Sequence, residues 1–203
     1  LSKIVKVNVK RDGFNWSQSY QLGVPDAPVA KGEATKDHGT TVSFWPSEEI
    51  FETTDFSFEV LSNRFREMAF LNKGLTIALK DERPGHVDEK GEQLQVVYCY
   101  QGGIVDFVRY INSTRGELHK SIIDLEQEDK KKKISLEIAM QWNTGFSESV
   151  FTFANAINTH EGGTHEEGFR TALTSVVNKF GEDWGFIRKK EDRLTGEDIR
   201  EGL

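Results

Sequence analysis

Hydrophobic and polar residues alternate with period two on both sides of the dipeptide Asp12–Gly13. The apolar members of these two runs are Ile4, Val5, Val7 and Val9, then Phe14, Trp16 and Tyr20. Alternation around an Asp-Gly turn predicts a β-hairpin. Residues 23–38 carry glycine and proline among charged residues, which predicts a loop. A third strand is predicted over 42–45, ended by Pro46.

The period changes to three and four residues over 57–71, where one helical face collects the apolar positions. These are Phe58, Leu61, Phe65, Met68 and Leu71. The spacing predicts an amphipathic helix, with Gly74 just beyond its end. Strands are predicted over 75–79 and 94–100, on either side of a charged loop.

The second half mixes the two periods. We predict a helix over 104–111, strands over 121–125, 134–142 and 149–155, and a long helix over 166–180. Its buried face should carry Phe169, Leu173, Val176 and Val177. The basic run 130–133 follows an acidic one and predicts an exposed hairpin turn. The pattern is that of an α+β protein, and the best domain boundary is at residues 101–103.

Composition narrows the class of protein only slightly. The 203 residues are 36% hydrophobic and 29% charged, with a net charge of −7. The acidic balance argues against a general nucleic-acid coat but leaves room for a local basic site. Cys99 is the only cysteine, so no internal disulfide can form, and a reducing cytosol is expected. It lies in an apolar run, where a packed residue is expected rather than a nucleophile.

One run of thirteen residues, 158–170, concentrates the candidate chemistry. Its central residues are His160, Glu161, Gly162, Gly163, Thr164 and His165. A zinc-hydrolase motif places two histidines at i and i+4 of a helix, but here they are five apart and separated by glycines. We therefore expect no metal site. A glycine-shaped turn before a helix is favoured, with Thr164 and Glu167 as a capping box, although free N–H groups there could also bind an anion.

Arg170 lies near the start of the long predicted helix, where the helix dipole disfavours a cation. It is either a simple surface arginine or a residue with a dedicated role. The chain has no phosphate-binding G-x-x-x-x-G-K-[ST] loop, no G-x-G-x-x-G and no G-x-S-x-G element. These motifs offer no catalytic residue.

Several blocks of the chain, in order, resemble the DNA gyrase B family, the ATPase subunits of bacterial type IIA topoisomerases. Beside residues 158–170, they are 39–46 (GTTVSFWP), 66–74 (REMAFLNKG), 140–143 (MQWN) and 196–203 (GEDIREGL). The blocks cover nearly the whole chain, and the actinobacterial members are the most similar. Members of the family commonly carry threonine where His38 stands, which puts the rim of the nucleotide pocket in doubt.

The resemblance implies a fold in two parts. Residues 1–101 would be the C-terminal part of a GHKL ATPase sandwich. Residues 102–203 would be the N-terminal part of a transducer domain, with a ribosomal-protein-like α/β fold and a left-handed βαβ crossover. In the family, ATP and Mg²⁺ drive two gyrase B molecules to close as a clamp around DNA, and gyrase A completes the cytoplasmic enzyme that supercoils DNA.

The resemblance also implies residue roles. Thr40 matches a threonine of the adenine pocket, close to the coumarin inhibitor site, and Arg170 matches an arginine of the cavity through which DNA passes. The catalytic glutamate, the Mg²⁺-binding asparagine and the lysine for the γ-phosphate match no residue here. We therefore expect no catalytic residue in this chain and no ATP hydrolysis by the chain alone.

Three other hypotheses remain open at this stage. The chain could come from the ATPase subunit of topoisomerase IV, which shares these blocks. It could instead be a non-catalytic dimerisation or relay module built on the same scaffold, and the histidines leave the zinc hydrolase as a third option. The abrupt start at Leu1 and end at Leu203 lead us to expect an excised piece of a longer protein, without a membrane segment.

Overall fold

The computed structural model describes all residues, Leu1–Leu203, and divides them into two compact units, Leu1–Ser57 and Phe58–Leu203. The division lies away from the expected domain boundary at residues 101–103. The expected boundary came from the Gly-Gly break and from the family resemblance, whereas the two units are defined by how closely their residues pack. The domain boundary therefore stays a prediction. Each unit is described by itself.

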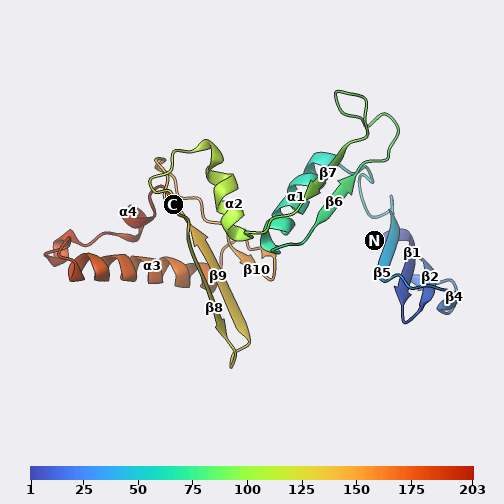
Figure 1. Ribbon diagram of the computed structural model, residues 1–203, viewed down its shortest axis with the longest axis horizontal. Helices are drawn as coiled ribbons and strands as arrows, with labels where there is room; N and C mark the ends of the chain where they lie inside the picture. Colours follow the sequence, from blue (N-terminus) through green and yellow to red (C-terminus); the bar gives the residue numbers. More distant parts are fainter. The chain divides into compact units, whose positions relative to one another are not determined.

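The first unit is an antiparallel sheet with strand order β3-β2-β1-β5, in which β4 also pairs with β2. Figure 1 labels β1, β2, β4 and β5 of this sheet. The bounds are β1 Ser2–Arg11, β2 Phe14–Gln21, β3 Val24–Pro25, β4 Ala30–Ala34 and β5 Gly39–Pro46. The predicted hairpin is confirmed, because Arg11 pairs with Phe14 across the Asp12–Gly13 turn. Both turn residues have positive φ, which fits an Asp-Gly hairpin turn.

The prediction of a continuous loop over 23–38 was wrong, because β3 and β4 lie within it. Every residue of β4 is exposed, so the strand has no buried face to produce a hydrophobic period. It is held by pairing with β2 and by Lys31, whose Nζ lies 3.4 Å from the centre of the Phe14 ring. Such a cation–π contact leaves no periodic signal in the sequence.

The second unit begins with helix α1, Phe58–Leu71, beside the hairpin of β6, Ile77–Lys80, and β7, Gln95–Tyr98. Helix α2, Ile104–Ile111, packs against both α1 and β9. The aromatic core of this region centres on Phe70, which is 1% exposed and stacks on Tyr100 at 3.6 Å between ring centres. These helices and strands lie where the sequence predicted them.

The rest of the unit contains a long hairpin, a short hairpin, two α-helices and the short 3-10 helix Lys190–Asp192 (Figure 1). The bounds are β8 Ile123–Asp129, β9 Ile134–Met140, β10 Phe153–Ala154, β11 Ile157–Asn158, α3 Thr164–Asp183 and α4 Gly196–Arg200. Residues 130–133 form the turn between β8 and β9, as predicted. None of the helices combines the length and the apolar character that a membrane span requires.

Several predictions in this unit were wrong in detail. The strand expected over 121–125 begins and ends later, at Ile123–Asp129. The strand expected over 149–155 shrinks to Phe153–Ala154, because the chain turns at once to pair with β11. Val176 is half exposed, although Phe169, Leu173 and Val177 are partly buried as expected. Cys99 is exposed, because Tyr98 turns its ring into the core and successive side chains of an extended segment point to opposite sides.

The C-terminal residues are held by close backbone contacts. Gly202 has φ +76°, and a Cβ at this position would lie 2.5 Å from the carbonyl oxygen of Asn143. The Asn143 amide donates to the Gly202 carbonyl at 2.8 Å, and the Ser149 amide donates to the Leu203 carbonyl at 2.7 Å. Only glycine suits this position, and it brings helix α4 against the segment that contains Glu148.

Candidate functional site

The candidate run 158–170 crosses from β11 through a tight turn into helix α3. Gly163 is the N-cap and Thr164 is already the first helical residue, with no side-chain hydrogen bond capping the helix. The predicted capping box of Thr164 and Glu167 is therefore wrong. The Thr164 hydroxyl sits one residue too late, since a cap residue must precede the helix.

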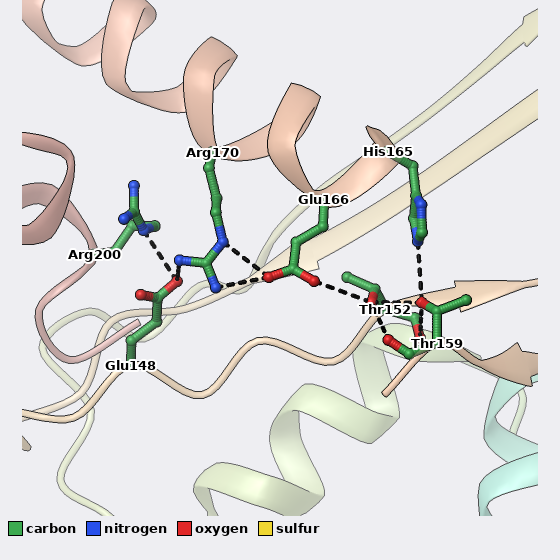
Figure 2. Close-up of polar contacts among 7 residues, drawn as sticks. All are labelled: Glu148, Thr152, Thr159, His165, Glu166, Arg170 and Arg200. Atoms are coloured by element: carbon green, nitrogen blue, oxygen red, sulfur yellow. Dashed lines mark hydrogen bonds and ion pairs between the residues drawn. The ribbon is translucent and has the colours of Figure 1, made fainter. Parts of the chain in front are cut away.

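Four side chains of alternating charge form a chain at the start of α3 (Figure 2). Arg170 donates from Nη1 to Oε1 of Glu148 at 2.5 Å, and from Nε and Nη2 to Oε1 of Glu166 at 2.9 and 2.7 Å. Arg200, on α4, donates from Nε to the same Oε1 of Glu148 at 3.0 Å. We call these four residues the ion-pair chain; their formal charges sum to zero.

A second group of polar side chains continues from Glu166 toward the glycine turn (Figure 2). Thr152 Oγ1 lies 3.5 Å from Oε2 of Glu166 and 2.7 Å from Oγ1 of Thr159. Thr159 Oγ1 in turn lies 3.1 Å from Nε2 of His165. These side-chain contacts join the segment before β10, the glycine turn and the start of helix α3.

The ion-pair chain is partly shielded from water. The side chains of Arg170 and Glu166 are 31% and 20% exposed, and that of Arg200 is 11% exposed. Burial by itself lowers the pKa of Arg170, but its hydrogen bonds to Glu166 and Glu148 outweigh burial and raise the pKa above the usual range. Arg170 is therefore a permanent cation held by two carboxylates.

A cavity of about 430 Å³ borders the site on the side of His165 and Glu166. Much of its wall is apolar and includes Phe107, Phe151 and Phe169. Apolar surroundings strengthen the attraction between the charges beside them. Glu166 thus lies between an apolar wall and the guanidinium that it binds.

The glycine turn contributes less side-chain chemistry than its composition suggested. His160 and Glu161 are exposed and make no polar side-chain contact, and Gly162 has φ +77°. Among the described residues, no group of three or more histidine, cysteine, aspartate or glutamate side chains is placed to hold a metal ion.

Thr40 belongs to the other unit, near the start of the edge strand β5. It pairs with Val9 across the strands and its side chain is exposed. Of the residues singled out in the sequence, the structure brings Arg170 and His165 together at the start of α3. Thr40 lies in a different unit from both.

The sequence missed Glu148, Thr152 and Arg200. Glu148 and Arg200 are 52 residues apart and carry no local pattern that pairs them. Only the pair of Glu166 and Arg170 has the i, i+4 spacing at which opposite charges meet on a helix. That spacing was the one available signal of the ion-pair chain.

The sequence of the whole chain is similar to those of known proteins. The protein-family model for DNA gyrase B matches residues 103–203. The whole chain is 60% identical to part of the DNA gyrase B protein of Streptomyces coelicolor, of which it covers 31%. The chain belongs to the DNA gyrase B family. It is also 48% identical to a 33% share of the DNA gyrase B protein of Mycolicibacterium smegmatis, so actinobacterial gyrase B proteins are strong relatives.

The solved structures agree with the family assignment. The fold matches that of the 43K ATPase domain of Thermus thermophilus gyrase B, crystallised with an aminocoumarin, with a TM-score of 0.80 and 26% identity. The match covers all of this chain and 53% of that one. The mixed α and β character expected from the sequence is confirmed. The chain spans about a third of the length of the curated gyrase B relatives that it matches.

Proposed function

We propose that the chain is the part of a gyrase B protein that couples ATP binding and hydrolysis to DNA strand passage and negative supercoiling. The observation that carries the proposal is the 60% identity to a gyrase B over the entire chain. The fold match to a gyrase ATPase domain, at much lower sequence identity, supports it as well. The activity itself belongs to the complete enzyme, which would work with gyrase A and a second copy of gyrase B in the cytoplasm.

Within this proposal, residues 102–203 are the first part of the transducer domain and residues 1–101 the last part of the GHKL ATPase domain. The family match, which begins at residue 103, supports the first assignment. A left-handed βαβ crossover needs two parallel strands, whereas every strand pair formed within this chain is antiparallel. The crossover would therefore need strands that are not paired here.

The nucleotide would be ATP with Mg²⁺, and Thr40 would contribute one hydrogen bond to its adenine pocket. The residues present do not make a complete nucleotide site, since the catalytic glutamate, the Mg²⁺-binding asparagine and the γ-phosphate lysine of the family match no residue of this chain. Relatives from Streptomyces niveus are named novobiocin-sensitive and novobiocin-resistant gyrase B, and the Thermus thermophilus ATPase domain was crystallised with an aminocoumarin, which supports a coumarin site in this family. Its place near Thr40 is part of the same proposal.

Arg170 would supply positive charge to the DNA cavity, where a phosphate backbone attracts arginine. The test is Arg170→Gln in a complete gyrase B protein reconstituted with gyrase A. We expect DNA-stimulated ATP hydrolysis and supercoiling to fall more than basal ATP hydrolysis. Arg188→Gln is the matched control, because Arg188 is exposed and only contacts the backbone of its own turn. Equal DNA-stimulated activity in Arg170→Gln and wild type would refute the cavity role.

A further inference from the structure

The contacts of Arg170 conflict with direct contact to DNA. Three of its N–H groups already donate to carboxylates, and both carboxylates would repel an approaching phosphate. A phosphate group and a carboxylate, however, both offer the guanidinium anionic oxygen acceptors for the same N–H groups. One acceptor can therefore replace the other without leaving the arginine unpaired.

The two carboxylates differ in how easily they can leave. Glu148 also binds Arg200, whose side chain is only 11% exposed. If Glu148 moved away, the nearly buried Arg200 would lose its carboxylate partner as well. Glu166 has no other cationic partner, and both of its contacts to Arg170 use one oxygen, Oε1. It also lies in the first turn of α3, where the helix dipole stabilises a free carboxylate.

We propose that Arg170 is an exchange site, at which a nucleic-acid phosphate replaces Glu166 while Glu148 stays bound and ties Arg170 to Arg200. This inference rests on the proposed DNA contact of Arg170. Glu166 is then an internal competitor of DNA, and Glu148 is a positioning residue that keeps the arginine aligned in both states. The movement of Glu166 would also alter the contacts of Thr152, Thr159 and His165 at the glycine turn (Figure 2).

The test measures the affinity of the complete gyrase B protein for a labelled DNA duplex over a series of salt concentrations. Glu166→Gln removes the competing charge but keeps the size of the side chain. Glu167→Gln is the matched control, because Glu167 lies in the same helical turn, is exposed and changes the net charge equally. We expect Glu166→Gln to bind DNA about fivefold more tightly than Glu167→Gln, equivalent to roughly 1 kcal/mol.

The exchange requires that the gain in DNA affinity of Glu166→Gln depend on Arg170. In an Arg170→Gln background, Glu166→Gln and Glu167→Gln should bind DNA equally. The slope of log affinity against log salt concentration should also fall by about 1, as expected when one phosphate contact is lost. If Arg170→Gln weakens DNA binding but the two glutamate variants remain equal in the parent background, the exchange is overturned while the DNA contact stands. If Arg170→Gln binds DNA like the wild type, the DNA contact itself fails.

A measurement without substitutions guards against misfolded variants. The NMR signals of the Nε–H groups of Arg170 and Arg200 report directly on their partners. On addition of duplex DNA, the Arg170 signal should shift strongly and the Arg200 signal weakly, because Glu148 remains bound to Arg200. An Arg170 signal that does not respond to saturating DNA contradicts the exchange.

Discussion

At the scale of single residues, Thr40 carries the sharpest test of the nucleotide site. Its hydroxyl is exposed on β5, where a ligand can reach it. In the complete gyrase B protein, Thr40→Ala should weaken nucleotide or coumarin binding by about 1 kcal/mol, as expected for one neutral hydrogen bond. Thr40→Ser should retain most of the affinity, and Thr41→Ala, on the opposite face of the strand, serves as control. Unchanged calorimetric affinity in Thr40→Ala would argue against a contact.

Residues of the candidate site were predictable only where their signal was local. The sequence placed Arg170 and Glu166 one helical turn apart, which is a visible spacing. Glu148 and Arg200 are 52 residues apart and meet through tertiary packing, where Gly202 permits a close backbone approach to Asn143. Thr164 was misplaced by one residue because glycine, which has no side chain to cap, can also occupy the N-cap position.

At the scale of elements, the cap of α4 offers a prediction about how Arg200 is placed. Thr195 accepts from the Asp198 amide at 3.2 Å, and Asp198 accepts from the Thr195 amide at 2.8 Å, which completes a capping box. Thr195→Ala should cost about 1 kcal/mol of stability and loosen the contact between Arg200 and Glu148. Urea unfolding, with Thr171→Ala on the exposed side of α3 as control, measures the cost. Equal stability of the two variants would exclude an important cap.

Elements with a strong period or a distinct turn were predicted well, and short exposed ones were not. Helix α1 has an apolar face, and the hairpin of β1 and β2 has an Asp-Gly turn. By contrast, β4 is wholly exposed, and β10 and β11 have two residues each, so their order comes from pairing with neighbours. A pattern of hydrophobic positions cannot reveal strands that bury almost nothing.

At the scale of the whole molecule, the two compact units and the domain boundary expected from the sequence divide the chain differently. The compact unit Phe58–Leu203 contains α1, β6 and β7 together with α2, although the expected domain boundary falls between β7 and α2. Arg66 spans this boundary, since its Nη1 donates to the Tyr110 hydroxyl at 2.5 Å and its Nη2 to the Tyr98 hydroxyl at 3.2 Å. Periodicity could locate the Gly-Gly break, but it could not show that side chains cross it.

This bridging core predicts where the stability of the second unit resides. Phe70 contacts Tyr100 from one side of the expected boundary and Phe107 and Tyr110 from the other. Phe70→Ala should therefore destabilise the unit by about 3–5 kcal/mol, the usual cost of deleting a buried aromatic ring. Phe186→Ala is the matched control, because Phe186 is 80% exposed and its loss should cost less than about 0.5 kcal/mol. Hydrogen exchange of amides in both α1 and α2 measures the effect on each side of the boundary. Loss of protection in α1 alone would show that the two sides are stabilised separately, whereas loss in both helices would establish a shared core.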